Sequence, residues 1–216
     1  MIVDLRAEQP NPPPLYNGKR KHRIAGGKVV TRDPATVDAI VLHQTACVFG
    51  KAAHQPTRHH RALGVACHAL AFNDGVVVLA NPLRSWVNHG NGFNSRSLGL
   101  EVECNARGLV ADPKTVSGLE VPPTPEAIAA GREAIAALVK LGRAEGMPIR
   151  YILAHRQSSP TRRSDPGEQL WKALVVDYAV PVLGLLAQPE LVMTDLKGRP
   201  GRPLPPQWDP GGVRAY

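Results

Sequence analysis

Two histidines and one aspartate in this sequence are residue types that could form a metal site. His43 and His155 each end a short apolar run, Ala-Ile-Val-Leu-His and Tyr-Ile-Leu-Ala-His, and Asp165 follows in the segment Arg-Arg-Ser-Asp-Pro-Gly. Two imidazoles and one carboxylate are the ligands of an open zinc site, whose fourth position is left for water. Such sites activate water for hydrolysis, so the set predicts a zinc hydrolase. Taken alone, either histidine is more often a satisfied core residue.

The length and the start of the chain set broad limits. The 216 residues are enough for one good-sized core with extensions, so we expect one domain. No apolar run approaches the roughly 20 residues that a membrane-spanning helix needs. An early acid, Asp4, and a proline-rich, basic stretch at 10–21 are unlike a secretory signal. We therefore expect synthesis in the cytoplasm without a signal peptide.

The charge of the chain bears on its partner. It has 26 Lys and Arg against 18 Asp and Glu, and the formal net charge of +8 favours an anionic partner. The basic residues are scattered, at 19–23, 58–61 and 162–163, without the stripe or motif of a nucleic-acid reader. We expect no specific nucleic acid, and another anionic polymer explains the charge as well.

The three cysteines offer a rival chemistry. Cys47, Cys67 and Cys104 are an odd number without a CxxC pair, which argues against a disulfide framework. Small buried core residues are the favoured interpretation. A cysteine hydrolase needs an activated thiolate beside a base, and none of the three lies in a recognisable nucleophile setting.

Apolar patterns predict the strands that carry the candidate residues. Residues 37–42 and 150–154 are runs typical of buried strands, so both histidines lie at strand ends, where sites in α/β sheets are built. Asn-Asp-Gly at 73–75, between two apolar runs, predicts a hairpin. Residues 97–104 alternate, with the apolar side chains on one face and Glu101 and Glu103 on the other.

Helix signals lie between and after these strands. Residues 55–64 could form a short helix. Thr124 as N-cap and Pro125 at the first helical position start a longer one that runs to about Glu145. A second long helix is predicted from Glu168 to about Leu186.

Together the elements predict an α/β fold, with a central mixed β-sheet flanked by about three helices. We divide the chain into an extended Pro-rich and basic lead-in at 1–35, a domain at 36–187 and a Pro/Gly-rich tail at 188–216. The tail has too few apolar residues to hold a core, so it is interpreted as a wrapping or loose extension. Either Pro-rich end could dock a partner.

Four short blocks carry a family resemblance. They are Val-Leu-His-Gln-Thr-Ala at 41–46, Val-Ala-Cys-His-Ala-Leu at 65–70 with Asn-Asp-Gly at 73–75, Ser-Leu-Gly-Leu-Glu-Val-Glu at 97–103, and Ala-His at 154–155 with Ser-Asp-Pro-Gly at 164–167. Each is weak alone, but their order is specific. The chain resembles the zinc-dependent N-acetylmuramoyl-L-alanine amidases (amidase type 2), which share a fold with peptidoglycan recognition proteins.

The resemblance implies roles for five residues. His43, His155 and Asp165 would bind Zn²⁺, which lowers the pKa of its water to roughly 7. Glu101 would be the general base. Relatives often have a lysine two residues before the aspartate to steady the oxyanion, and Arg163, at that position, keeps the charge on a bulkier, planar group. Alternatively, Glu101 could be a solvated residue on the face of its strand, and Arg163 could simply pair with an acidic side chain.

The loop between the second and third blocks lines the glycan-peptide groove in relatives. Aromatic faces pack on sugars, and amides hold hydroxyl and peptide groups. The candidate substrate-binding residues are Trp86, Asn88, His89 and Asn94. An ordinary surface loop is the alternative. His68 is expected to pack in the core or behind the ligands, and Gln44 either orients a ligand or substrate or has no role.

The implied function is hydrolysis of the amide bond between N-acetylmuramic acid and L-alanine in peptidoglycan. A phage-type lysis enzyme or a delivered cell-wall-degrading effector is favoured, because intact walls are anionic. A cytosolic wall-recycling amidase and a non-catalytic peptidoglycan-binding module of the same fold are the rivals, although the complete ligand set argues against the module. We expect action on the bacterial wall after holin-type release, injection or secretion.

Overall fold

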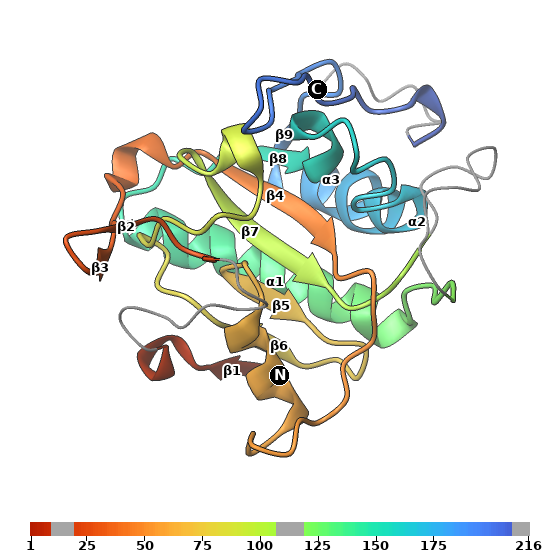
Figure 1. Ribbon diagram of the computed structural model, residues 1–216. Helices are drawn as coiled ribbons and strands as arrows, with labels where there is room; N and C mark the ends of the chain where they lie inside the picture. Colours follow the sequence, from red (N-terminus) through yellow and green to blue (C-terminus); the bar gives the residue numbers. More distant parts are fainter. Residues whose placement is uncertain (10–19, 107–118, 209–216) are drawn as a thin grey trace.

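A seven-stranded sheet in the order β1-β6-β5-β7-β4-β8-β9 forms the centre of the protein (Figure 1). The computed structural model describes residues 1–9, 20–106 and 119–208. Neighbouring strands run parallel except β5 and β6, which form the predicted hairpin. The strands are β1 (Ile2–Asp4), β4 (Ala39–Gln44), β5 (Ala69–Ala71), β6 (Val77–Leu79), β7 (Ser97–Val102), β8 (Tyr151–Ala154) and β9 (Leu186–Ala187), with β2 (Ile24–Ala25) and β3 (Lys28–Val29) in a separate pair.

The long helix α1 (Pro125–Ala144) begins where the sequence predicts. The Thr124 side chain accepts a hydrogen bond from the backbone N–H of Ala127, and proline occupies the first turn. The predicted short helix at 55–64 is the 3₁₀ helix η3 (Arg58–Gly64). The other 3₁₀ helices in the described residues are η1 (Arg6–Glu8), η2 (Pro34–Thr36), η4 (Asn91–Phe93), η6 (His155–Ser158) and η8 (Pro206–Trp208).

The predicted second long helix is shorter and less regular than expected. It consists of α2 (Glu168–Trp171), the π-helical segment η7 (Lys172–Ala179) and α3 (Val180–Leu183). Gly184 then takes a left-handed conformation with φ 65°, which ends the helix. The prediction that the helix reaches Leu186 is therefore wrong, since that residue begins β9. The mixed sheet and three α-helices confirm the predicted fold class.

Two layers cover the sheet. On one face, α1 and η7 pack on the main core of aliphatic side chains. On the other face, Phe93 and Met193 pack on β4 and β8, while Leu5 and Ala62 pack on β5 and β6. The apolar side chains of β7 join the main core, as the alternating pattern predicts.

Strand β4 lies between β7 and β8, and all six of its residues are buried. Its register with the two neighbours places His43 beside Glu101 of β7 and Leu42 beside Ala154 of β8. His155 follows directly after Ala154. Both histidines therefore lie at strand ends, as predicted, and they meet Glu101 at one end of the sheet.

Parts of the flanking segments pack on this sheet. Near the N-terminus, β1 pairs with β6 as an edge strand. Near the C-terminus, Leu204 and Trp208 are buried in the main core, so the tail supplies core residues that its composition did not suggest. The division at 1–35, 36–187 and 188–216 stays a prediction. Residues 10–19 and 209–216 lie outside the described part, so docking through the Pro-rich ends is untested. The helices that the structure describes include none long and apolar enough to span a membrane.

Candidate metal centre

His43, His155 and Asp165 come together at the end of the sheet, where one ligand atom from each lies within 4.8 Å of the others. The two histidine Nδ1 atoms are 2.9 Å apart although the residues are 112 positions apart in the sequence. Nδ1 of His155 is 2.9 Å from Oδ2 of Asp165, and Nδ1 of His43 is 3.7 Å from Oδ1. All three residues are buried. The structure thus brings together the set predicted from the sequence.

The protonation states of His43 and Asp165 fit a zinc ion. Burial, together with the neighbouring His155, lowers the pKa of His43 to about 4, so its imidazole is neutral at ordinary pH. Burial works to raise the pKa of Asp165, but His155 and His43 outweigh it and hold that pKa well below the usual value. Neutral imidazole and ionised carboxylate are the metal-binding forms. Two nitrogens and one oxygen facing one point are a suitable donor set for Zn²⁺.

His89 lies behind His43 rather than in a substrate groove. Its Nδ1 is 3.1 Å from Nε2 of His43, and its Nε2 is 3.3 Å from the backbone oxygen of Ser97. When His43 offers Nδ1 to a metal, its Nε2–H donates to His89, whose own Nε2–H donates to Ser97. A Cβ built on Gly99 would lie 2.7 Å from Cγ of His89, so only glycine leaves room for this ring. His89 is therefore placed to orient a ligand.

Gln44, whose role the sequence left open, holds the loop that carries the aspartate. Its backbone N–H donates to Oδ1 of Asp165 at 3.1 Å, and its side-chain amide donates to the backbone oxygens of Ser164 at 2.6 Å and Ala106 at 2.9 Å. The residue after the first ligand thus ties β4 to the third ligand.

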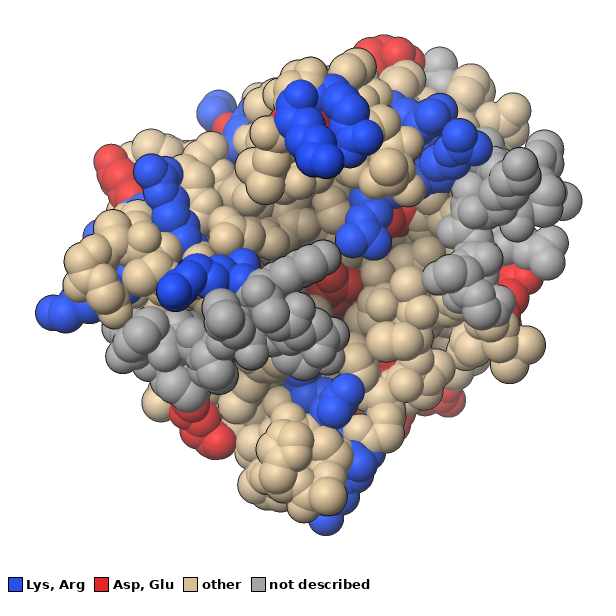
Figure 2. All heavy atoms as spheres, viewed as in Figure 1, with Lys and Arg blue, Asp and Glu red and all other residues tan. Residues whose placement is uncertain are grey.

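Glu101 borders a groove next to these ligands. The groove has a volume of about 460 Å³, and Cys47, Phe49 and Asn88 also line it. Oε2 of Glu101 is buried and has no hydrogen-bond partner among the described residues. Burial, and next the charge of Asp165, raise the pKa of Glu101 well above its usual value. Figure 2 shows a hollow in the face viewed, with acidic atoms inside it and Lys and Arg side chains around it.

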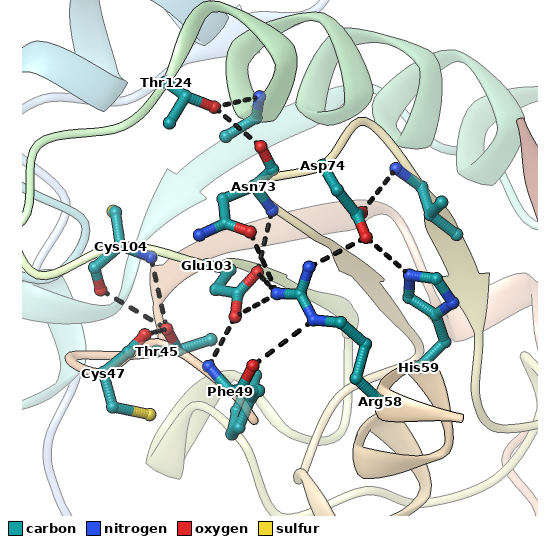
Figure 3. A network of polar contacts seen from close by, with 12 residues as sticks. Thr45, Cys47, Phe49, Arg58, His59, Asn73, Asp74, Glu103, Cys104 and Thr124 are labelled. Atoms are coloured by element: carbon teal, nitrogen blue, oxygen red, sulfur yellow. Dashed lines mark hydrogen bonds and ion pairs between the residues drawn. The ribbon is translucent and has the colours of Figure 1, made fainter. Parts of the chain in front are cut away.

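Glu103 has a different environment from Glu101, although the alternating pattern grouped them. Its buried carboxylate accepts two hydrogen bonds from Nη2 of Arg58, at 2.5 and 2.7 Å (Figure 3). It also accepts from the backbone N–H groups of Phe49 at 2.5 Å and Asn73 at 2.8 Å. This network, which the sequence did not reveal, joins the groove-lining loop to the hairpin turn.

The predicted substrate-binding residues fall into two groups, those at the surface and those inside the fold. Asn88 is exposed and lines the groove. Trp86 is half-buried beneath the guanidinium of Arg23, 4.6 Å from the ring centroid. Asn94 is buried, and its side-chain oxygen accepts from the backbone N–H of Gly90 at 2.6 Å. Asn94 and His89 are therefore corrected from substrate contacts to internal supports, because both side chains bond within the fold.

Two further residues lie near the centre. Arg163 is exposed on the loop before Asp165, and its backbone oxygen accepts from Nη1 of Arg156 at 2.6 Å. His68 is buried in the core, where its Nδ1 accepts from the backbone N–H of Gly99 at 2.9 Å.

The cysteines are not activated. Cys47 lines the groove, and burial raises the pKa of its thiol. Cys67 and Cys104 are buried; burial raises the pKa of Cys67 well above its usual value and that of Cys104 to about 12. A raised pKa disfavours the thiolate that a nucleophile requires.

Several solved structures align with this chain, and the first of those that follow shows the same fold. Wild-type peptidoglycan recognition protein LB of Drosophila aligns with a TM-score of 0.50 and 15% identity, over 86% of this chain and 96% of that chain. The amidase LysC of Clostridium intestinale aligns with a TM-score of 0.46 and 17% identity, over 71% of this chain and 89% of that chain. Peptidoglycan recognition protein SD of Drosophila aligns with a TM-score of 0.48 and 22% identity, over 78% of this chain and 89% of that chain.

The family comparison covers the whole candidate site. No curated protein matches the sequence. The family model Amidase_2, described as N-acetylmuramoyl-L-alanine amidase, matches residues 33–168, which is more than half of the chain and includes all three predicted ligands. The chain therefore belongs to the amidase type 2 family of N-acetylmuramoyl-L-alanine amidases.

Proposed function

We propose that this protein is a zinc-dependent amidase that hydrolyses the bond between N-acetylmuramic acid and L-alanine in peptidoglycan. The observation that carries the proposal is the convergence of His43, His155 and Asp165 beside Glu101, at the edge of a groove. The family to which the chain belongs supports the bond and the substrate class.

The ligand residues account for the metal's place. His43 and His155 would hold Zn²⁺ through the ring nitrogens that face each other, and Asp165 through its carboxylate. Zn²⁺ bound there would act as a Lewis acid, polarising the amide carbonyl and lowering the pKa of water. Gln44 and His89 would keep these ligands oriented toward the metal.

The proton transfers fall to Glu101. Its unpartnered Oε2 takes a proton from the attacking water and delivers it to the amine that leaves with the L-alanine end. Arg163 supplies positive charge to the oxyanion as the tetrahedral intermediate forms. The side chain of Asn88 lies in the groove wall, where it can bind the glycan or the peptide.

The setting we propose is lysis of the bacterial wall, by a phage-type enzyme or a delivered effector that reaches the wall after release, injection or secretion. The net charge of +8 supports this setting, because it favours binding to an anionic wall. A wall-recycling amidase would act on soluble fragments, which carry far fewer negative charges per molecule than an intact wall and so gain less from such a charge.

The test is mass spectrometry of the products released from purified sacculi, with and without a chelator. We expect free stem peptides that begin at L-alanine, lost on chelation and restored by Zn²⁺. His155→Ala should lose both zinc binding and lysis. Intact sacculi that retain the protein would instead identify a binding module, and cleavage only of soluble fragments would identify a recycling enzyme.

A further inference from the structure

The C-terminal strap, which we define as residues 188–208, packs on the turn that follows the second metal ligand. The backbone N–H of Met193 donates to the backbone oxygen of Gln157 at 2.8 Å. The backbone N–H of Arg202 donates to the backbone oxygen of Arg156, also at 2.8 Å. In the other direction, the side-chain amide of Gln157 donates to the backbone oxygens of Gln188 at 2.6 Å and Leu191 at 3.0 Å. The strap lies beyond the residues that the family model matches.

Arg156 links this strap to the loop that carries the third ligand. Its backbone N–H donates to the oxygen of Asp165 at 3.0 Å, and Nη1 of its side chain donates to the oxygen of Arg163 at 2.6 Å. Nε of the same side chain donates to the backbone oxygen of Pro203 at 3.1 Å. The guanidinium carbon lies over the ring of Trp208, 5.0 Å from its centroid. One buried side chain thus touches both the strap and the loop at 155–165.

The strap is fixed at its far end and closely fitted in its middle. Trp208 is fully buried, with its ring centroid 6.3 Å from that of Trp171. Gly201 lies so close to η6 that a Cβ built on it would overlap the backbone oxygen of Gln157 and the nitrogen of Ser158. The strap can therefore hold the turn only while residue 201 has no side chain.

The ligands differ in how much support the sheet gives them. His43 lies in β4, where it pairs with Glu101 of β7, whereas His155 and Asp165 lie beyond the end of β8. Ordering such a loop costs about 1–2 kcal/mol of backbone entropy per residue, which lowers metal affinity unless other contacts have ordered it beforehand. Such contacts come from the strap.

We propose that the strap fixes His155 and Asp165 in metal-binding geometry, with Arg156 as its positioning residue. The inference rests on the metal site of the proposed function. Removing contacts that orient ligands usually weakens metal affinity by about 10–100-fold, and we expect the same range for a loosened strap.

The first test compares two glycine-to-alanine variants of the full chain. Gly201→Ala forces the strap away from η6 without changing any side chain of the site. Gly50→Ala is the matched control, because nothing lies within 4 Å of its added Cβ. We expect calorimetry on metal-free protein to show Zn²⁺ bound about 10–100-fold more weakly by Gly201→Ala, with affinity unchanged in the control.

The second test covers the case in which Gly201→Ala does not fold. Arg156→Met removes the donors and the stacking but keeps a long side chain. Arg132→Met is its control, because Arg132 also donates to a backbone oxygen, that of Ala173, and lies over an aromatic ring, that of Tyr178. Arg156→Met should weaken Zn²⁺ binding and alter the visible absorption of the Co²⁺-loaded protein, and Arg132→Met should do neither.

These outcomes separate the strap from the metal site itself. Wild-type affinity in folded Gly201→Ala or Arg156→Met would overturn the strap and leave the proposed function standing. Equal weakening in the controls would also overturn it, because the loss would then reflect general destabilisation. A wild-type protein that binds no Zn²⁺ would overturn both.

Discussion

Glu101 and Glu103 lie two positions apart on the same side of β7 and its extension, yet their carboxylates have opposite surroundings. Glu103 accepts hydrogen bonds from Arg58 and two backbone N–H groups, so its charge is fully compensated. Oε2 of Glu101 has no partner in the part of the chain that the structure describes. The difference indicates that Glu103 stabilises the fold, whereas Glu101 keeps an unsatisfied oxygen at some cost in stability and is free to act on a substrate.

The sharpest way to test this difference is Glu101→Gln. The variant should retain Zn²⁺ and lose about 10²–10⁴-fold in turnover, because an amide cannot accept the proton of the attacking water. Its stability should change little, because the amide has the shape of the carboxyl group it replaces and Oε2 has no partner among the described residues. Turnover on sacculi and the thermal midpoint measure the two effects, and turnover equal to wild type would remove Glu101 from the mechanism.

The reciprocal change is Glu103→Gln. It weakens the hydrogen bonds that Glu103 accepts, while Asp74 still pairs with Arg58 at 2.8 Å, so we expect the free energy of unfolding to fall by about 1–3 kcal/mol. Turnover per folded molecule should stay close to wild type. Urea unfolding with active-site titration checks both expectations. A loss of turnover as large as that of Glu101→Gln, in fully folded protein, would erase the distinction between the two glutamates.

A smaller effect is expected from His89→Ala, which removes the support behind His43. Zn²⁺ affinity should fall by about 10–100-fold, the usual effect of removing a residue that orients a ligand. His54→Ala, an exposed histidine, is the control and should leave the affinity unchanged. If His89→Ala binds Zn²⁺ as tightly as wild type, the ligand is held by other contacts.

The smallest effect is expected from Cys47→Ser, in the same groove as Glu101. Because burial raises the pKa of this thiol, little thiolate is present, and turnover should stay within about twofold of wild type. The variant should also resist any inhibition by thiol alkylation that wild type shows through blocking of the groove. A loss comparable to that of Glu101→Gln would revive the cysteine hydrolase.

The sequence predicts the elements whose signals are local. Thr124 before Pro125 marks the start of α1, and the turn at 73–75 marks the hairpin, because capping and turn conformation depend on a few neighbouring residues. Strand β1 was missed because three residues show no period, and its place at the sheet edge depends on pairing with β6. The π-helical segment η7 likewise carries no pattern that differs from an ordinary helix.

The candidate site divides in the same way. Residue types and block order identify the three ligands, and the structure brings them together. Alternation places Glu101 and Glu103 on one side but cannot distinguish them, because the distinction depends on Arg58, 45 positions before Glu103. His89 was assigned to the substrate groove because its loop position gives no sign of the contact with His43, 46 positions away.

The 112-residue separation of the two histidines has a consequence for folding kinetics. Their strands meet only when β4 and β8 pair, and such non-local pairing is slow because it closes a long loop. Zn²⁺ therefore meets its complete set of ligands only after most of the chain has folded. Interactions absent from the transition state slow unfolding and leave the folding rate nearly unchanged. We expect loss of the metal to shorten the lifetime of the folded protein, while the rate at which it folds stays the same.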